Sequence, residues 1–569
     1  MIKLIGSILA LAVIVIGVIY GIKPLTKIEP VPKTRKFGTE TRIMFVDFTD
    51  AMKTGWEGSE TKGAAVTVWG VNLGNRPGSV MIGRTTLNQQ SDFAEWGATD
   101  NPTTARGLER VTFWLNSSIA PGRTALRVTT SNGFTSNSLP FYCRSIGLNH
   151  IYFISPTGND SNDGLSVATA WRTAKKAREI EAGDIIYLKA GIYANIDSWD
   201  AVIDFWSNNH NNGSENNYIG VASYPGEVAQ IGDNTTQCAI RRHGTSEPDH
   251  LSYWTFSKFI LRGNGSVTAW ANRGSSDHIK FIGNDISTTY GGKSAASFSG
   301  ADGGQQYLYF YGNYACDASV DSRGQTAPTK AYPLYLGGYG WHNYIYIGWN
   351  EFAYNEWGQG IQLYGHNVGD WIDNIYIHDN YFHHNGMYGA VLGGGDPTSG
   401  NYEFIRNCYF YNNIVAFNGH RGYAGMIVGG VGGGDNGGNW HIYNNIFYHN
   451  NNGEINVGGS PDSVVVKNNI IISNPGEGYY EGLSGDFLSG NNNCYFGGGI
   501  MPYWDDESIN ADPQFIENSF VIGRDSPCKD VGDNSVISMI GRDYMNITRP
   551  QNRQIDIGAF ETRGLSRRR

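Results

Sequence analysis

Three side chains that can take up a proton lie close together in the sequence, at His420, Arg421 and Tyr423. Histidine, arginine and tyrosine can each act as the base that removes a proton beside a carboxylate, provided that a cation neutralises the developing charge. This cluster is therefore the best candidate for an elimination reaction. We add Glu454, which follows in the next repeat of the chain, as a fourth candidate catalytic group.

Two acidic residues are candidates for binding a metal ion. The runs Gly393–Asp396 and Gly432–Asp435 both read Gly-Gly-Gly-Asp, so Asp396 and Asp435 occupy equivalent positions in successive repeats. Carboxylate oxygens are ligands that Ca²⁺ prefers, and this pair predicts a Ca²⁺ site. The alternative is that both aspartates are ordinary turn residues after a glycine run.

A hydrolase would need a different arrangement, with two carboxyl groups separated by ~5 to 9.5 Å. Glu454 with Asp435, or Glu356 with Asp396, are the pairs that the chain offers. A further group consists of three histidines, His378, His383 and His384. We interpret these histidines as loop and turn residues rather than as metal ligands.

Aromatic and amide side chains near these groups are suited to sugars, because a ring covers the apolar face of a sugar while polar groups bind its hydroxyls. The candidate substrate-binding residues are Tyr335, Trp357, Gln362, Tyr364, Tyr388 and Asn456. Alternation along a strand predicts that Val391, Ile427 and Glu454 point outward with them. Each tyrosine can equally stack on its counterpart in the next repeat.

The elements that must position these residues are repeated. An apolar alternating phrase that ends on Asn recurs seven times, with the Asn at positions 284, 313, 350, 380, 413, 445 and 469. Gly-bounded strands such as Gly389–Leu392 follow, so each repeat contains about three short strands. No ten-residue segment of these repeats keeps a 3.6-residue period, which excludes a helical solenoid. The pattern predicts a parallel β-helix in which the asparagines stack as a ladder at strand spacing.

Three shorter regions precede the repeats. Leu4 to Tyr20 is an apolar run, short for a membrane span, and Lys3 before it fits a signal peptide as well as an uncleaved membrane anchor. We expect this segment to occupy residues 1–23, a linker residues 24–40, a β-sandwich residues 41–145 and the β-helix with its C-terminal cap residues 150–562. The expected location is extracytoplasmic, either secreted or anchored at the cell surface.

Composition excludes several other classes of protein. Charged residues make up only 17% of the chain, against a usual ~25%, and aromatics reach 13%, so a disordered chain is excluded. The 42 basic and 52 acidic residues give a net charge of −10, which argues against nucleic acid as a partner. The six cysteines are far apart, so neither a disulfide scaffold nor a Cys/His metal site is predicted.

Two parts of the chain resemble known families. The phrases Val68–Gly74 (VWGVNLG), Val80–Gly83 (VMIG) and Val128–Gly133 (VTTSNG) resemble an IPT/TIG immunoglobulin-like module. The phrases of the larger region are Ser155–Asp160 (SPTGND), Trp171–Thr173 (WRT), Gly183–Tyr187 (GDIIY), Asp512–Phe515 (DPQF) and Asp556–Glu561 (DIGAFE). With the Asn repeats, they resemble right-handed parallel β-helix proteins of the pectin-lyase-like superfamily. The expected fold class is therefore all-β.

The second resemblance implies a polysaccharide bound along the outer strand that follows the Asn turn. The leading hypothesis is a polysaccharide lyase or related depolymerase, favoured over a glycoside hydrolase. The Asp-Asp-Gly runs of polygalacturonase-like hydrolases are missing, as are the Trp-Ile-Asp-His and Arg-x-Pro-x-x-Arg patterns of pectate lyases. The alternative is a non-enzymatic surface adhesin or structural spike that binds glycans. Under either hypothesis the partner is a polysaccharide or cell-surface glycan, and the membrane is a partner if the N-terminal segment is not cleaved.

Overall fold

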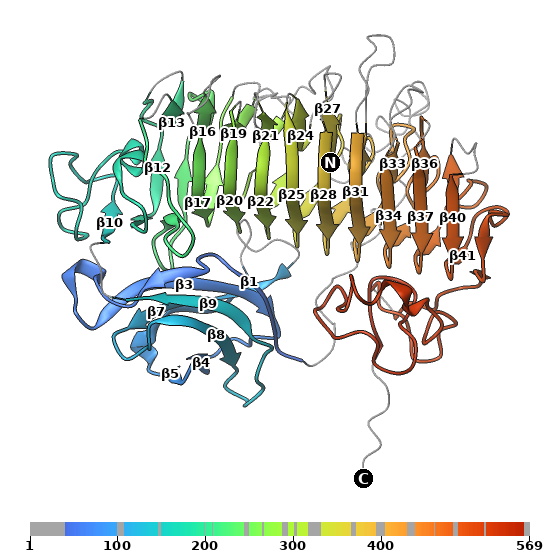
Figure 1. Cartoon of the computed structure of the whole chain (residues 1–569), viewed down its shortest axis with the longest axis horizontal. Helices are drawn as coiled ribbons and strands as arrows, with labels where there is room; N and C mark the ends of the chain where they lie inside the picture. The colour runs from blue at the N-terminus through green and yellow to red at the C-terminus, as the bar shows by residue number, and fades with distance from the viewer. Residues whose placement is uncertain are drawn as a thin grey trace, which may run out of the picture.

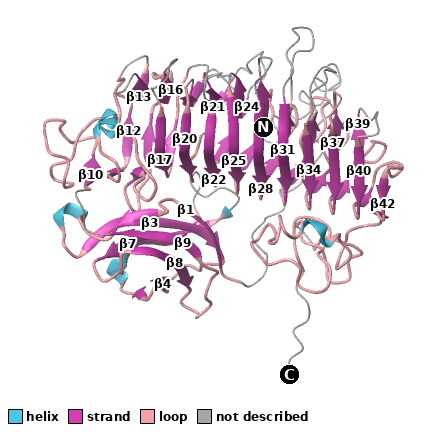
Figure 2. Cartoon of the chain, in the orientation of Figure 1, coloured by secondary structure: helices cyan, strands magenta, loops and turns pink. Residues whose placement is uncertain are grey.

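In the computed structural model, almost all of the regular secondary structure is β-strand (Figure 2). It describes residues 40–99, 107–145, 149–197, 200–206, 209–243, 250–264, 267–272, 274–286, 294–300, 304–316, 332–338, 340–365, 371–393, 404–429, 438–459, 461–481, 487–516 and 519–562. The apolar run Leu4 to Tyr20 lies outside these residues. In the part of the chain that is described, no helix has the length and apolar character needed to cross a bilayer.

The larger region winds through stacked parallel sheets, as the repeats predict. A thirteen-stranded sheet contains β10 (Ile151–Ile154), β11 (Ile185–Leu188), β14 (Ile219–Ser223), β17 (Leu251–Ser257), β20 (Ser276–Ile282), β22 (Gln305–Tyr311), β25 (Trp341–Gly348), β28 (Trp371–His378), β31 (Phe404–Tyr411), β34 (Asn439–Tyr443), β37 (Ser463–Lys467), β40 (Leu488–Asn491) and β42 (Asp505–Asp506). A ten-stranded sheet contains β13 (Ala201–Trp206), β16 (Cys238–His243), β19 (Val267–Asn272), β21 (Ser294–Gly300), β24 (Tyr332–Gly338), β27 (Ile361–Gly365), β30 (Ala390–Leu392), β33 (Met426–Val428), β36 (Ile455–Val457) and β39 (Tyr480–Glu481).

The third side of each coil is a short strand that follows the Asn turn. An eight-stranded sheet contains β23 (Tyr314–Cys316), β26 (Glu351–Ala353), β29 (Tyr381–His383), β32 (Ile414–Ala416), β35 (Ile446–Tyr448), β38 (Ile470–Ile472), β41 (Cys494–Phe496) and β43 (Ile509–Asn510). Before it, β12 (Gly191–Tyr193), β15 (Ala229–Ile231) and β18 (Phe259–Leu261) form a three-stranded sheet, which single bridges through Asp285 connect to β23. The larger region is thus the predicted right-handed parallel β-helix (Figure 1).

The predicted Asn ladder is confirmed. All seven asparagines are fully buried, and Asn493 extends the column by one coil. The backbone N–H of each member donates to the side-chain oxygen of the next at 2.8–3.0 Å. Each side-chain NH₂ also donates to a strand carbonyl of the preceding coil, as Asn413 does to Ile377 O at 2.8 Å. Stacked amides therefore satisfy the backbone of this turn in every coil.

The N-terminal region is a two-layer β-sandwich. One layer contains β1 (Arg42–Val46), β3 (Lys62–Val71), β7 (Glu109–Asn116) and β6 (Phe93–Ala98). The other contains β2 (Asp50–Met52), β9 (Leu139–Arg144), β8 (Gly122–Thr129), β4 (Ser79–Ile82) and β5 (Thr85–Leu87). The short 3₁₀ helices of the described residues are η1 (Trp56–Gly58), η2 (Gln90–Asp92), η4 (Ala174–Glu179) and η6 (Asn534–Val536), the last two being part of the larger region.

The sandwich is packed firmly against the first coils of the helix. The Tyr187 hydroxyl donates to Ala65 O at 2.7 Å and accepts from Ala65 N at 2.9 Å. The buried ammonium of Lys258 donates to the Thr67 hydroxyl at 2.8 Å. Burial raises the pKa of Asp47 to about 6, and the charge of Lys258 opposes that rise. Breaking this contact would leave buried charges without partners, so the two regions behave as one body.

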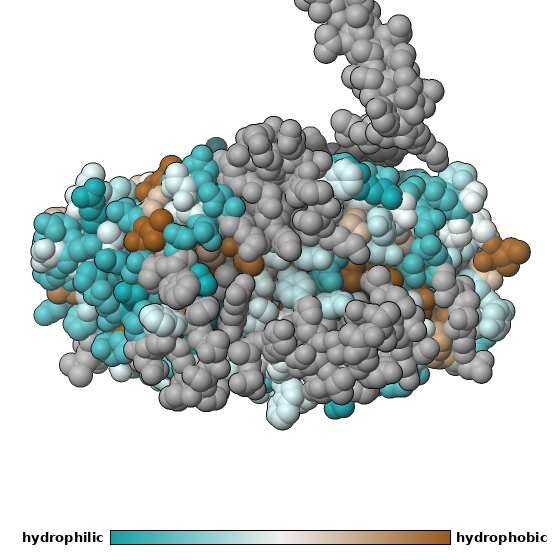
Figure 3. Space-filling view, turned by 90° about the horizontal axis from the view of Figure 1, so that it is seen from above, coloured by the Kyte–Doolittle hydropathy of each residue, from teal (hydrophilic) through white to brown (hydrophobic). Residues whose placement is uncertain are grey.

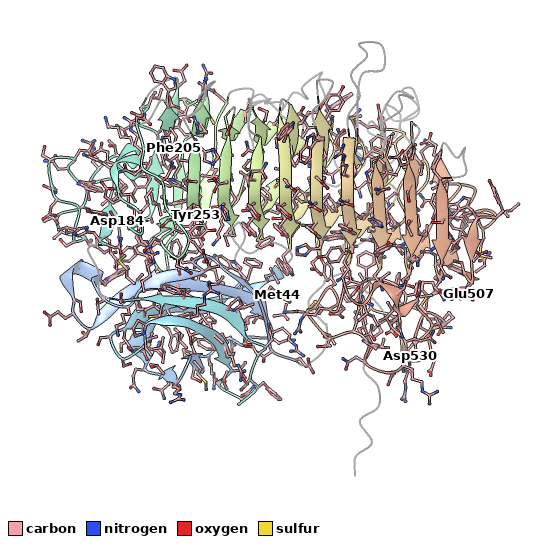
Figure 4. All side chains as sticks on the ribbon, in the orientation of Figure 1. Met44, Asp184, Phe205, Tyr253, Glu507 and Asp530 are labelled. Carbon is pink, nitrogen blue, oxygen red and sulfur yellow. The ribbon has the colours of Figure 1, made fainter. Side chains whose placement is uncertain are left out.

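The C-terminal segment, from about residue 511, folds back over the outer face of the eight-stranded sheet. Its buried apolar residues include Phe520, Ile522, Tyr544, Ile557 and Phe560, which pack on Tyr381, Ile414, Ile446 and Ile470. Asn546 donates to Ile43 O of the sandwich at 3.0 Å. The sandwich and this segment therefore lie together along one side of the helix, where Figure 4 labels Met44 and Asp530.

Candidate functional site

The candidate residues lie in three successive turns that lead into the ten-stranded sheet. Glu356 and Trp357 lie between β26 and β27, Tyr388 lies between β29 and β30, and Arg421 lies between β32 and β33. Backbone hydrogen bonds hold the turns side by side, since Arg421 N donates to Gly386 O at 3.0 Å. Stacking of the coils thus brings together residues that are more than sixty positions apart in the sequence.

A charged cluster joins the first and third of these turns. His420 Nε2 lies 3.1 Å from Glu356 Oε2, and the guanidinium of Arg421 donates to Glu356 Oε1. Arg421 Nε also donates to Glu356 O at 2.6 Å. The hydrogen bond from His420 is the largest influence on the pKa of the Glu356 carboxyl and, with Arg421, holds it below its ordinary value, so the carboxylate is charged at neutral pH.

An aromatic ring also holds the guanidinium of Arg421 in place. Arg421 Cζ lies 3.2 Å from the centroid of the Trp357 ring, a close cation–π contact. The side chains of His420 and Glu356 remain 42% and 44% exposed, and that of Arg421 27%. The cluster therefore presents an oriented cation and an imidazole at the surface. His420 and Arg421 lie together, as predicted. Glu356 was predicted only as half of a hydrolase pair with Asp396, and its contact with His420 and Arg421 was not predicted.

Beside the cluster lies a patch of tyrosine and amide groups. The rings of Tyr388 and Tyr423 meet edge to face with centroids 5.1 Å apart. Burial, together with the charge of Glu481, raises the pKa of Tyr388 to about 12, and a hydrogen bond with Asn456 opposes this rise. Asn456 Nδ2 donates to Glu481 Oε2 at 2.8 Å. Tyr388 is thus a neutral phenol, and Glu481 is a member of the patch that the sequence analysis missed.

The outward column of the ten-stranded sheet forms the floor of this patch. Tyr335, Gln362, Val391, Ile427, Asn456 and Glu481 occupy the same register position on successive strands. Val391 and Ile427 point outward as predicted, but Tyr388, Tyr423 and Ala424 cover them in a small separate apolar cluster. Gln362 is only 9% exposed and accepts from the side chain of Gln359. The centre of the column is therefore covered, whereas Asn456 and Glu481 are half-buried.

Two predicted binding residues lie on the middle strands of the same sheet. Tyr335 on β24 and Tyr364 on β27 are half-buried. The Tyr335 ring lies 5.7 Å from the ring of Tyr332 at a tilted angle. Burial, followed by the nearby Tyr364, raises the pKa of Tyr332. These three tyrosines form an aromatic group beside Gln362, in line with the column.

The prediction for Glu454 is wrong. This side chain is fully buried, and its two carboxylate oxygens accept from the backbone N and the side-chain NH₂ of Asn450. It ends a second ladder that runs through Asn355, Asn385, Asn418 and Asn450. Burial raises the pKa of Glu454 well above its ordinary value. Because β36 begins only at Ile455, Glu454 belongs to the turn and points inward, where no polymer can contact it.

The second ladder was missed although the sequence contains its signal. Each of its four asparagines follows a member of the first ladder by five residues, as Asn355 follows Asn350 and Asn418 follows Asn413. The two ladders enclose β26, β29, β32 and β35, each of which has three residues. This constant spacing means that both ends of the short strand are fixed by amides, with the candidate turns directly after the second one.

The metal hypothesis concerns residues that the structure does not describe. Asp396 and Asp435 both lie outside the described residues, as does one member of each predicted hydrolase pair. Among the residues that are described, no group of three or more His, Cys, Asp or Glu side chains is arranged to hold a metal ion. The histidines predicted as loop and turn residues fit that prediction only in part, because His378 ends β28 and His383 ends β29, whereas His384 follows the strand. His378 bonds Asp379, and His383 lies 2.9 Å from His384 and 3.2 Å from Glu351.

Seen from the side opposite the sandwich, the described surface mixes hydrophilic and hydrophobic residues (Figure 3). Within those described residues the figure shows small separate apolar groups rather than one broad apolar patch.

Comparisons with known proteins add structural likenesses at low identity. No protein-family model matches the sequence, and no curated protein matches it. The structure is similar to that of pectate lyase Pel9A, with 16% identity over 74% of this chain and 97% of that chain and a TM-score of 0.46. It is similar to a rhamnogalacturonan lyase, with 14% identity over 63% of this chain and 85% of that chain and a TM-score of 0.30. It is also similar to a Yersinia enterocolitica family 28 exopolygalacturonase, with 10% identity over 81% of this chain and 92% of that chain and a TM-score of 0.28. Values this low do not assign an activity to this chain.

Proposed function

We propose that the protein is an extracytoplasmic, carbohydrate-active β-helix protein that cleaves an acidic polysaccharide by elimination. The observation that carries the proposal is the cluster of Glu356, His420 and Arg421, which is half-exposed beside the tyrosine and amide patch. A polymer laid along the ten-stranded sheet would pass both groups. Rings and amides then contact the sugar, and the charged cluster lies next to it.

The cluster contains the two functions that an elimination requires. A hydrogen bond from His420 Nε2 to Glu356 leaves Nδ1 as the nitrogen that can accept a proton, so Glu356 orients His420 as the base. Arg421, held by Glu356 and Trp357, supplies a fixed positive charge for the carboxylate of a uronate. A cation placed there in advance stabilises the charge that develops when the neighbouring proton leaves.

The roles of the other candidates follow from their positions. We propose that Tyr423, adjacent to the cluster, donates a proton to the departing sugar oxygen, and that Tyr335, Tyr364 and Asn456 bind sugar along the sheet. Trp357 acts through Arg421 rather than through direct sugar stacking, because the guanidinium covers its ring. From their equivalent positions in the sequence, Asp396 and Asp435 would hold Ca²⁺, which would neutralise the substrate carboxylate.

The N-terminal regions suit attachment at a cell surface. We propose that residues 1–23 act as a signal peptide or membrane anchor and that the sandwich is an IPT/TIG-like spacer. Its broad contact with the first coils would hold the helix at a fixed angle to whatever the sandwich is attached to. Fractionation of cells followed by N-terminal sequencing would test the location and the cleavage; protein found only in the cytoplasm would contradict the proposal.

The activity is tested with a panel of uronate-containing and neutral polysaccharides. We expect ultraviolet absorbance from unsaturated products with at least one uronate polymer, and a loss of about 10² to 10⁴-fold in rate for His420→Ala. Glu356→Gln should also lower the rate strongly, because it removes both the orientation of His420 and the anchor of Arg421. The matched control is Glu215→Gln, whose ion pair with Arg123 is 72–82% exposed on the sandwich side.

Other outcomes separate the competing functions. New reducing ends without unsaturated products would show a hydrolase and overturn elimination. Binding of a uronate polymer without any turnover, unaffected by His420→Ala, would support the adhesin instead. The fixed ion pair of Arg421 and Glu356 is the observation that favours such a binder, because both partners already satisfy each other.

A further inference from the structure

A second exposed aromatic surface lies on the outer face of the thirteen-stranded sheet, away from the candidate site. One column of stacked rings contains Tyr309, Tyr346, Tyr376, Tyr409 and His441, with centroids 4.5–5.3 Å apart. A neighbouring column contains Tyr253, His278, Tyr307 and Tyr344, with centroids 4.2–4.8 Å apart. All nine side chains are half-buried. The strands that carry them face the viewer in Figure 1.

Stacking of the coils does not itself require rings at these positions. After His441 the first column continues in the same register as Val465 and Ser489, and the strands pair there as before. A small or aliphatic side chain is therefore sufficient for this sheet. The aromatic rings on five successive coils are therefore not required for the coils to stack, and they are a feature of the surface.

The four residues of the second column have a strained backbone conformation. Tyr253, His278, Tyr307 and Tyr344 have φ between 51° and 58°, in the left-handed region. The same position in the next two strands is taken by Asn374 and Asn407, each with φ of 50°. Asparagine tolerates this conformation far better than tyrosine does. Four rings are thus kept where asparagine would be less strained, and strain of this kind is typical of functional positions.

Polar groups and tryptophans extend the same surface. Trp341 is 56% exposed and stacks on Trp371 with centroids 5.4 Å apart. Asn374 Nδ2 donates to Asn343 Oδ1 at 3.0 Å, beside the ring of Tyr344. An exposed indole with amides alongside is the combination that recognises the apolar face and the hydroxyls of a sugar.

The charged groups of this surface have both signs. His250 and His278 both bond the carboxylate of Asp277. Asp373 accepts from Asn407 Nδ2 at 2.9 Å, and Arg406 Cζ lies 5.7 Å from the Trp371 ring. Asp373 and Arg406 occupy the same register position on adjacent strands, and a surface with both signs close together has no net preference for a polyanion or a polycation. Its composition fits an uncharged, hydroxyl-rich chain.

We propose that this aromatic face, made of the two ring columns with Trp341 and Trp371, binds a neutral polysaccharide along the helix axis. The rings repeat once per coil, so a chain with a regular sugar repeat meets an equivalent contact at each coil. The binding is independent of the cleavage proposed at the ten-stranded sheet. It would hold the protein on a neutral matrix while the other face acts on an acidic polymer.

The test is affinity electrophoresis of the full chain in native gels cast with glucomannan, arabinoxylan or mixed-linkage β-glucan. We expect at least one of these polymers to retard the parent protein. The double variant Trp341→Ala with Tyr344→Asn should bind at least about tenfold more weakly, because two aromatic contacts are lost. Tyr344→Asn is chosen because Asn374 and Asn407 already occupy the equivalent backbone position, so folding is preserved.

Controls separate this face from the proposed active site and from self-association. Tyr503→Ala removes a ring that is 91% exposed elsewhere and should not change retardation. Glu356→Gln should also keep full retardation, whatever it does to cleavage. The proposal is overturned if none of the three polymers retards the parent, or if the double variant is retarded equally. A parent dimer that the double variant converts to a monomer, seen by light scattering, would assign the face to a second copy of the chain and also overturn it.

Discussion

Two amide ladders run through the helix at opposite ends of the short three-residue strands, and they differ in length and termination. The first has eight asparagines, from Asn284 to Asn493, and ends on the Ser508 hydroxyl and the Asp505 carboxylate. The second has four, from Asn355 to Asn450, and ends on the buried carboxylate of Glu454. Both satisfy backbone groups in the same way, through amides that stack from coil to coil.

Their surroundings explain why only one of them adjoins a candidate site. The turns that carry the first ladder contain no inserted loop residues. The C-terminal segment covers these turns, since Asn412 donates to Arg542 O and Asn444 donates to Asp556 O. The turns after the second ladder contain Glu356 and Arg421, which reach solvent. A fixed ladder beside a variable turn combines rigidity with freedom of sequence, which is what a binding or catalytic site requires.

Removing an amide from the middle of the first ladder should have the largest effect on stability. Asn413→Leu deletes donors to Ile377 O and Asn445 Oδ1 and an acceptor for Asn380, all of them buried. We expect the free energy of unfolding to fall by about 3–5 kcal/mol, because buried partners are left unsatisfied. Urea titration followed by circular dichroism measures it. The exposed Asn88→Leu is the control, and a loss below about 1 kcal/mol for Asn413→Leu would show that the ladder is dispensable.

The equivalent change in the second ladder should cost less stability but affect the site. Asn418→Leu removes donors to Phe382 O and Asn450 Oδ1. We expect a loss of about 2–3 kcal/mol, because the adjacent half-exposed turn can shift and admit water. The polymer cleavage or binding of the folded protein should fall as well, since Asn418 lies two residues before His420. Unchanged function in Asn418→Leu would separate the ladder from the site.

The carboxyl group at the end of the second ladder should produce a pH-dependent effect. Burial raises the pKa of Glu454, so the folded chain retains a proton that the unfolded chain releases above about pH 4.3. Its contribution to stability is therefore greatest below that pH and declines as the pH rises. Glu454→Gln carries a neutral amide, and we expect its stability relative to the parent to increase between pH 4 and pH 8. Parallel thermal unfolding curves for both proteins at all pH values would contradict this.

The smallest effect on stability is expected where the surface cluster is changed. Glu356→Gln removes a half-exposed ion pair, and such pairs contribute about 0–1 kcal/mol. We expect the free energy of unfolding to change by no more than this, while polymer turnover falls. A stability loss as large as that of Asn413→Leu would mean that Glu356 belongs to the framework rather than to the site.

The regular part of this protein was predictable because its signal is local and repeated. Seven asparagines at the end of the same phrase indicated stacked coils, and the structure confirms each of them. The pairing of His420 with Arg421 was also visible, because the two are adjacent. Their link to Glu356 was not, because it crosses 64 and 65 residues and two coils. The burial of Glu454 was predicted wrongly because the alternation of inward and outward side chains was applied to a residue that precedes β36.

The sequence by itself therefore determined the coil, its inward and outward faces and the first amide column, since each rests on a short-range pattern that every repeat carries. Only the tertiary structure decided which turns meet, which carboxylate is buried and which rings remain at the surface. Those outcomes depend on the relative length of neighbouring coils and on what the sandwich and the C-terminal segment cover. Such contacts join residues far apart in the chain, and no local pattern records them.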